Sequence, residues 1–305
     1  MDREQFLTAH PTAGPSGVDL RYEPDFAGLR AQIGTMSREA RTDPDGRVDP
    51  APVLDWDSFL DISASLAEKG RDLRLLTMVT RAWTQTDGLT GLRAGLEVLA
   101  RNITEYWDTL HPKLRAAETP TDGARLRATA LLQLVNTDDG LLGDLQMGHM
   151  LTQVPVIDDV LGGDLALAGL DEATLLTAVF GEAMKWPAAV AEVKADQDAR
   201  LARLKTGFAA LQDPKFGKTD VLPTLLNELQ AAKAAAEAVQ TAFETAGGFR
   251  LTGAAAEALD PARRAENRGL HDSGMSLSPL VTFLSRCATF VAGSLSPAVS
   301  NDHAP

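Results

Sequence analysis

The sequence predicts an all-α protein: a helical bundle of antiparallel helix pairs, followed by a flexible linker and a short C-terminal helix. Three observations carry this prediction. Apolar residues recur at three- and four-residue spacings along most of the chain, which is the period of one helix face. Aromatic residues make up only 5% of the 305 residues, and Ala and Leu dominate. Glycine and proline steps interrupt the pattern at intervals, where helices end.

The first helix is expected after Pro24, because Phe26, Leu29 and Ile33 recur on one face. A polar, proline-rich loop follows over residues 42–53. It separates this helix from the next pair.

Two aspartates mark the start of that pair. Asp55 suits the N-cap of a helix that stops at Lys69-Gly70, and Asp72 suits the N-cap of a helix that carries Trp83 inward. The short connection between the two helices predicts a hairpin.

The longest apolar stripe runs from Leu89 to Leu110, directly after an Asp87-Gly88 step. It ends at His111-Pro112, because proline disfavours helix at the residue before it. At 1.5 Å per residue this core helix would be about 34 Å long.

Helices are also predicted over residues 122–135 and 171–185, and from Pro187 to residue 211. A long Ala-rich helix follows from about residue 220 to 246. The short connection before it predicts that this helix packs antiparallel on residues 188–211.

A final helix is expected to open at Ser278-Pro279. Because a helix joined by a flexible linker must bury its apolar face somewhere, this face is a candidate interface for an oligomer or a partner. Its members are Leu280, Phe283, Leu284, Phe290 and Val291.

Charge and length limit the classes of partner. The 29 Lys+Arg and 42 Asp+Glu residues give a net charge of −13, and no basic cluster of the kind that tracks phosphates is present, so no nucleic acid is expected.

One cysteine, Cys287, fits a reducing compartment. The N-terminus lacks a secretory signal, and the apolar segment 280–295 contains Arg286 and is shorter than the roughly 20 residues that cross a bilayer. We therefore expect a cytoplasmic protein without membrane insertion.

The common catalytic motifs are absent from the sequence, including a phosphate-binding glycine loop, a paired-histidine zinc motif and a nucleophile elbow. The five histidines never lie three or four residues apart, so none forms a metal pair on a helix. We expect no enzyme, no catalytic residue, no metal and no cofactor.

Two other function classes stay open. One is a helical ligand-binding or regulatory module that uses the glycine-rich stretch 140–169 as a pocket rim. The other is an enzyme with carboxylate chemistry at Asp138-Asp139 or Asp158-Asp159. Adjacent residues on a helix point apart, so these aspartate pairs suit turns and caps better than a paired acid/base site.

Three stretches contain combinations of residues that helix periodicity alone does not explain. They are Gly14 to Phe26, Asp55-Trp56 followed by residues 70–74, and Tyr106 to Pro112. In this order and spacing they resemble the ImpA-type N-terminal domain of TssA proteins, which are components of the bacterial type VI secretion system. The resemblance is strong over residues 14–112, and residues 216–226 and 276–286 are similar to the family's hinge and final motif. The signature residues are Gly17, Asp19, Leu20, Arg21, Tyr22, Pro24, Trp56, Asp72, Leu73, Arg74, Tyr106, Trp107, Asp108, His111 and Pro112.

The resemblance implies an ImpA-type helical domain over residues 1–212, a long helix within 213–246, a linker over 247–275, and a short helix and tail over 276–305. It also implies a cytoplasmic scaffold that is not an enzyme. Such proteins assist baseplate assembly, prime or cap the contractile tail sheath, contact baseplate and sheath proteins, and form homo-oligomers.

The signature has two physical interpretations. Residues 14–22 either form an N-terminal strap that is pinned onto the bundle, or they present a docking patch for a partner. We favour the strap, because a motif spread over three segments that meet in space is more easily a packing constraint. This interpretation predicts that Arg21→Ala or Trp107→Ala lowers the melting temperature. Trp56, Trp83 and Trp186 are expected in the core.

Overall fold

The structure is a computed structural model, and it describes residues 3–10, 14–36, 41–42, 48–49, 54–148, 161–170, 187–216 and 218–295. These residues form an all-α fold, as predicted, with one short antiparallel pair of two-residue strands, β1 (Arg41–Thr42) and β2 (Val48–Asp49). None of the described helices is long and apolar enough to cross a membrane. The predicted helix over residues 171–185 lies outside the described residues.

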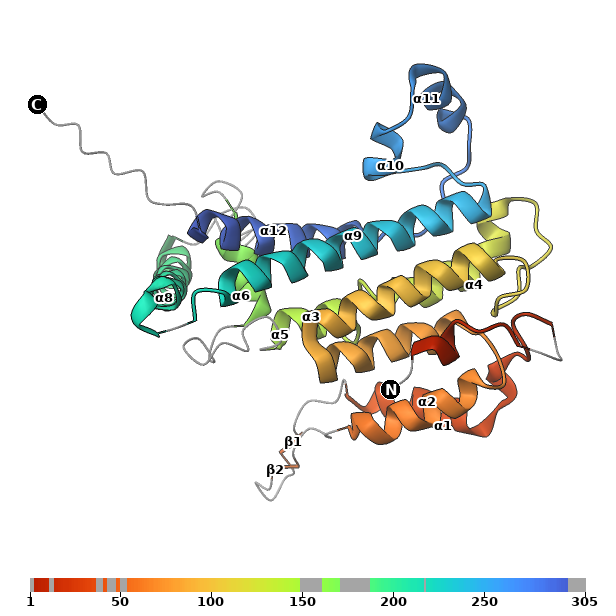
Figure 1. The fold of residues 1–305 in the computed structure, drawn as a ribbon, viewed down its shortest axis with the longest axis horizontal. Helices are drawn as coiled ribbons and strands as arrows, with labels where there is room; N and C mark the ends of the chain where they lie inside the picture. The colour runs from red at the N-terminus through yellow and green to blue at the C-terminus, as the bar shows by residue number, and fades with distance from the viewer. Residues whose placement is uncertain are drawn as a thin grey trace, which may run out of the picture. The chain divides into compact units, whose positions relative to one another are not determined.

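The helices follow the predicted order (Figure 1). Their bounds are α1 (Pro24–Met36), α2 (Trp56–Ala67), α3 (Leu73–Tyr106), α4 (Pro120–Leu132), α5 (Leu141–Met147), α6 (Gly162–Ala168), α8 (Pro187–Gln212), α9 (Val221–Gly247), α10 (Gly253–Glu257), α11 (Pro261–Arg268) and α12 (Ser278–Leu295). The described residues also contain the 3₁₀ turns η1 (Arg3–Phe6), η2 (Leu20–Tyr22) and η4 (Pro214–Phe216).

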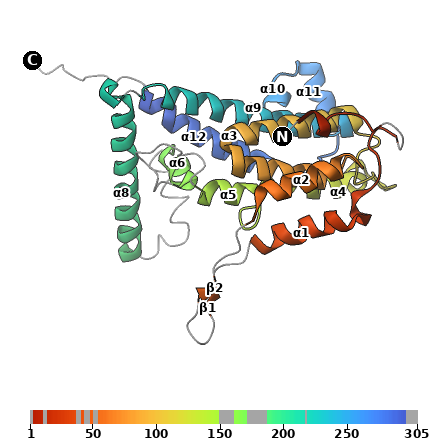
Figure 2. The ribbon, with the colours of Figure 1, turned by 60° about the horizontal axis from the view of Figure 1, so that its bottom comes forward.

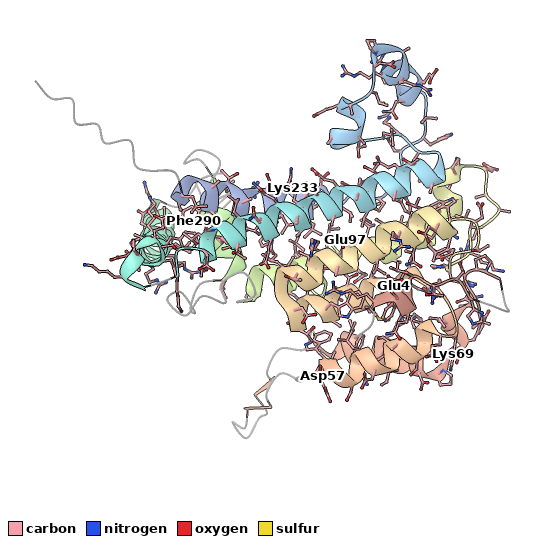
Figure 3. All side chains as sticks on the ribbon, viewed as in Figure 1. Glu4, Asp57, Lys69, Glu97, Lys233 and Phe290 are labelled. Atoms are coloured by element: carbon pink, nitrogen blue, oxygen red, sulfur yellow. The ribbon has the colours of Figure 1, made fainter. Side chains whose placement is uncertain are left out.

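The chain divides into two compact units, of which the first comprises residues 1–144 and 232–281. Its helices α1, α2, α3 and α4 lie side by side (Figures 1 and 2). Charged residues such as Asp57, Lys69 and Glu97 lie on the exposed surface of this unit (Figure 3). Apolar side chains such as Phe59 and Leu92 have no exposed surface and belong to its core.

The helix α3 is a hairpin of two helical segments, which confirms the predicted break at Asp87-Gly88. Gly88 has φ 60° and ψ −138°, a conformation that glycine adopts without strain. The two segments pack closely, because a Cβ on Gly95 would lie 2.6 Å from Cγ2 of Thr80. Glycine at this position is what lets the segments approach.

The predicted helix caps are confirmed at two positions. The carboxylate of Asp55 accepts the backbone N–H of Ser58, and that of Asp72 accepts the N–H of Arg74. The helix α4 begins earlier than predicted, at Pro120, because the hydroxyl of Thr119 accepts the N–H of Asp122 and caps it.

Residues 247–275, predicted to be a linker, instead contain α10 and α11. Neither helix contains a buried residue, so no apolar period marks them in the sequence. Polar contacts hold the segment: the buried carboxylate of Glu244 accepts the N–H of Thr252 at 2.8 Å, and Asn267 bonds both backbone groups of Leu251.

The second unit comprises residues 145–231 and 282–305. Within it, Phe208 of α8 packs against Phe290 of α12, with 5.3 Å between ring centroids, and Arg200 pairs with Asp164 at 2.9 Å. The antiparallel packing of α9 on α8 that the sequence predicts stays a prediction.

The apolar face of α12 is covered by the chain itself. Leu280, Leu284 and Val291 have no exposed surface, Phe283 is 4% exposed, and Phe290 is half-buried. The apolar pattern makes this face a candidate interface, but such a pattern shows only that a face is buried and not which chain buries it. A role of this face in binding an oligomer or a partner stays a prediction.

Candidate functional site

The three signature stretches meet in the first unit through backbone contacts. Gly17 pairs with Gly70 in a single antiparallel bridge, and Asp72 pairs with His111 in a parallel one. The N–H of Leu73 donates to the carbonyl of His111 at 2.8 Å. The predicted meeting of these segments is therefore confirmed.

Two glycines permit the closest of these contacts. Gly17 has φ +61°, and a Cβ on it would lie 2.1 Å from the carbonyl oxygen of Lys69. A Cβ on Gly70 would lie 2.2 Å from the carbonyl oxygen of Val18. A side chain at either position would separate the strap from the bundle.

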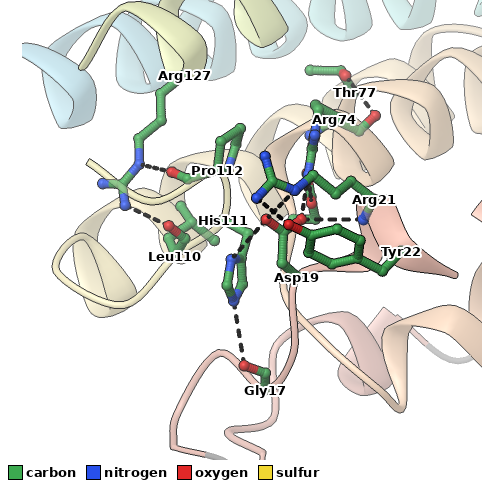
Figure 4. Close-up of polar contacts among 11 residues, drawn as sticks. Gly17, Asp19, Arg21, Tyr22, Arg74, Thr77, Leu110, His111, Pro112 and Arg127 are labelled. Carbon is green, nitrogen blue, oxygen red and sulfur yellow. Dashed lines mark hydrogen bonds and ion pairs between the residues drawn. The ribbon is translucent and has the colours of Figure 1, made fainter. Parts of the chain in front are cut away.

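Arg74 lies at the centre of the polar contacts (Figure 4). Its guanidinium bonds Asp72 through two nitrogens, at 2.9 and 2.5 Å, and reaches Asp19 at 2.8 Å. The side chain of Arg21, by contrast, contacts Asp19 through Nε, at 3.2 Å.

The charge of Asp19 is stabilised by its neighbours. Partial burial favours the neutral acid and opposes the shift, but the N–H of Arg21 and the guanidinium of Arg74 lower the pKa of Asp19 below its usual value. His111 is buried beside it, with Nδ1 4.0 Å from the carboxylate and Nε2 3.3 Å from the carbonyl of Gly17.

Further signature residues act in packing. Leu20 and Leu73 are fully buried, Pro24 begins α1, and the hydroxyl of Tyr106 donates to the carbonyl of Leu7 at 2.7 Å. Trp107 packs edge-on against Phe243, with 5.3 Å between centroids.

The other tryptophans were predicted to lie in the core, and those that the structure describes are buried to different degrees. Trp83 is 3% exposed, whereas Trp56 is half-buried and packs edge-on against Phe59 at 5.6 Å. Asp108 is exposed. Trp186 lies outside the described residues.

Arg127 is a site residue that the sequence interpretation missed. Its fully buried guanidinium donates to the carbonyls of Leu110 and Pro112 (Figure 4), and it also donates to the carbonyl of Trp107. Burial lowers its pKa to about 10, while the charge of Asp108 acts in the opposite direction. A lone arginine on a predicted helix face gives no signal for this role, because its acceptors are backbone atoms.

Arg21 and Tyr22 do not pack into the fold, which corrects the strap interpretation for these two residues. The Tyr22 side chain is 74% exposed, and the Arg21 guanidinium stacks over its ring at 4.6 Å and donates to its hydroxyl at 2.5 Å. The polar ends of both residues can be satisfied by each other and by water, so nothing forces them inside. The pair therefore forms an exposed feature of the surface.

A groove begins beside this pair. One cleft of about 600 Å³ is lined by residues that include Arg21, Tyr22 and Lys113, and a second of about 460 Å³ is lined by residues of α1, α3 and α4. Arg74, Pro112 and Leu126 line both. We call these two adjoining clefts together the α1–α4 groove.

The alternative sites have less support where the structure describes them. Asp138 and Asp139 are exposed in a turn, where the N–H of Asp138 donates to the Asn136 side chain at 2.9 Å, as expected for a turn. Asp158-Asp159 and much of the glycine-rich stretch lie outside the described residues. Among the described residues there is no group of three His, Cys, Asp or Glu side chains placed to hold a metal.

Comparisons with known proteins agree with the resemblance. Residues 7–136 match the family described as ImpA, N-terminal, type VI secretion system. The type VI secretion system component TssA1 of Pseudomonas aeruginosa is 29% identical over 142 residues. That match covers 44% of this chain and 40% of the relative's length, so the sequence relationship concerns the N-terminal part of this chain.

A solved structure extends the likeness in fold. The N-terminal domain of the TssA component from Burkholderia cenocepacia, which includes the conserved ImpA_N region, aligns with a TM-score of 0.51. The alignment covers 96% of this chain and 94% of that domain at 18% identity. By these comparisons the chain is similar to TssA components of the type VI secretion system, with an ImpA-type N-terminal region over residues 7–136.

Proposed function

We propose that this protein is a non-catalytic cytoplasmic scaffold that assists baseplate assembly in a type VI secretion system and primes or caps the contractile tail sheath. The observation that carries the proposal is that the signature residues have two different roles. Most of its residues hold the fold, whereas Arg21 and Tyr22 are exposed at the rim of the α1–α4 groove.

An exposed pair of this kind is suited to binding another protein. Arg and Tyr are enriched among the residues that dominate interface energies. The Arg21 guanidinium is already stacked on and bonded to Tyr22, so less side-chain freedom is lost when a partner contacts the pair. Baseplate and sheath proteins are the proposed partners, and self-association into a homo-oligomer is compatible with the same surface.

The test is affinity purification of the tagged protein from cells that express the apparatus, followed by mass spectrometry. We expect recovery of baseplate or sheath components, and the set recovered distinguishes a baseplate role from a sheath-end role. Recovery of none of them would refute the scaffold proposal and favour the ligand-binding alternative.

A first prediction concerns the surface pair. Tyr22→Ala should reduce recovery of the secretion components about tenfold, which corresponds to loss of an ordinary interface contact. The melting temperature should be unchanged, because the side chain is 74% exposed. Leu270→Ala, which removes a 43% exposed apolar side chain elsewhere in the first unit, is the control and should leave recovery unchanged. A lowered melting temperature for Tyr22→Ala would restore the strap interpretation.

A further inference from the structure

The α1–α4 groove has an apolar floor. Ile33 of α1, Met78 of α3 and Leu126 of α4 line it, and each is only partly buried by the chain. The two clefts adjoin, because Arg74, Pro112 and Leu126 line both. The groove therefore offers apolar contact area to a segment that lies along it.

The charge of the groove is opposite to that of the whole chain. Six cationic side chains and three carboxylates line it, whereas the chain has a net charge of −13. Two of the carboxylates already have cationic partners: Asp19 pairs with Arg74 at 2.8 Å, and Glu23 pairs with Lys69 at 2.6 Å.

Three of the cations are available for a partner. Within the part of the chain that the structure describes, the exposed side chains of Arg30, Lys113 and Arg115 form no ion pair or hydrogen bond. Arg30 lines the cleft at the α4 side, and Lys113 and Arg115 line the cleft beside Tyr22. Positive charge is therefore distributed along the groove rather than gathered at one point.

We propose that the α1–α4 groove binds an acidic, amphipathic peptide segment of a partner protein. This inference rests on the proposed scaffold function and adds the chemistry of the partner. The apolar side of the segment contacts Ile33, Met78 and Leu126, and its carboxylates face the unpaired cations at both ends. Recognition of an amphipathic segment in a groove needs this combination of apolar floor and spaced charges.

The same observations disfavour a small anionic ligand. A site for a small molecule has a few polar groups that converge on one position, whereas these cations line two different clefts. Because the rest of the chain is acidic, an acidic segment is repelled elsewhere and attracted here, which gives the groove its selectivity.

Two glycines of α1 provide a matched pair of variants. A Cβ on Gly34 or on Gly28 would meet no atom within 4 Å, but only Gly34 is among the residues that line the groove. Gly34→Leu places a side chain in the groove, and Gly28→Leu places the same side chain elsewhere on the helix. Neither should lower the melting temperature, because leucine is a better helix former than glycine.

The variants are compared by affinity purification of the tagged full-length protein from cells that express the apparatus. With Gly34→Leu, we expect the recovered amount of at least one secretion component to fall about tenfold, because the interface is blocked. With Gly28→Leu, the recovered amount should equal that of the wild-type protein. Equal recovery by both variants overturns the groove as a docking site and leaves the scaffold function intact.

Photo-crosslinking identifies the partner segment at the groove and therefore its charge and apolar content. Tyr22→p-benzoylphenylalanine introduces a crosslinker at the rim, and the same substitution at Leu270, away from the groove, is the control. We expect the Tyr22 crosslink to lie in a partner segment with net negative charge and apolar residues, and recovery to decrease with added salt. A crosslink to a neutral or basic segment overturns the acidic partner. If the wild-type protein recovers no secretion component, the scaffold function is refuted and the groove proposal fails with it.

Discussion

The buried guanidinium of Arg127 shows how one side chain can position a whole segment. It donates to the carbonyls of Trp107, Leu110 and Pro112, which are three of the seven residues of the third signature stretch. With a pKa of about 10 it remains protonated at neutral pH. The charge is stabilised by carbonyl dipoles, which accept strong hydrogen bonds from a cation.

A second prediction concerns this arginine. Arg127→Ala should lower the free energy of unfolding by about 3 kcal/mol, because buried carbonyls lose their donor and a cavity is left. Chemical denaturation followed by circular dichroism measures the change. Arg125→Ala, an exposed arginine on the same helix, should change stability by less than about 0.5 kcal/mol. Equal effects for the two would contradict the anchoring role.

A third prediction concerns the carboxylate of Asp19. Its pKa is lowered in the folded protein, so its charged form adds stability above the unfolded pKa, and this stability is lost as pH falls through the lowered folded pKa. Wild type should therefore exceed Asp19→Asn in stability by a constant amount from about pH 5 to 7, and the difference should shrink below about pH 4. Denaturation midpoints between pH 3 and 7 measure it, with Asp61→Asn, an exposed carboxylate outside the network, as the control. A difference that does not vary with pH would exclude this linkage.

At the scale of elements, the sequence indicated where helices start and stop but not how closely they pack. The caps at Asp55 and Asp72 and the break at Gly88 depend on atoms within a few residues, so local patterns identify them. The segment of α10 and α11 has a local cap at Asp260, which accepts the N–H of Arg263, but it has no apolar period because neither helix contains a buried residue. Polar contacts of Glu244 and Asn267 also hold it.

A fourth prediction tests the packing of the α3 hairpin. Gly95→Ala should lower the free energy of unfolding by about 1–3 kcal/mol, because its Cβ would lie 2.7 Å from Cα of Thr80. On helix propensity alone the change would be stabilising by up to about 1 kcal/mol. Gly28→Ala, where the Cβ meets open space, isolates that propensity effect and should be neutral or stabilising. A stabilising Gly95→Ala would show that the two segments can separate at little cost.

At the scale of the whole molecule, the first unit is assembled from two distant parts of the sequence. The family match ends at residue 136, yet Trp107 packs against Phe243, and Phe243 also stacks on Phe249 at 5.5 Å. The ImpA-type region therefore depends on residues more than a hundred positions later.

A fifth prediction follows from this dependence. Phe243→Ala should lower the free energy of unfolding by about 3–5 kcal/mol, as expected for a fully buried aromatic side chain. Phe290→Ala is the matched comparison. Because Phe290 is only half-buried, this substitution should lower the free energy of unfolding by less than Phe243→Ala does. Calorimetry of both variants measures the difference. A small effect at Phe243 would mean that the matched region is stable without the later helix.

The sequence by itself determined the helical class, the main breaks and caps, the absence of an apolar membrane-length segment, and the signature that indicated the family. These features are local, because helical period and capping are set within about four residues.

Only the tertiary structure decided which signature residues hold the fold and which are exposed. The three stretches lie up to about ninety residues apart in the sequence, so the fork of Arg74, the anchor of Arg127 and the free surface of Tyr22 depend on contacts that no local pattern records. The α1–α4 groove arises in the same way. Its apolar floor and its unpaired cations come from separate helices and loops, and only packing brings them to one surface.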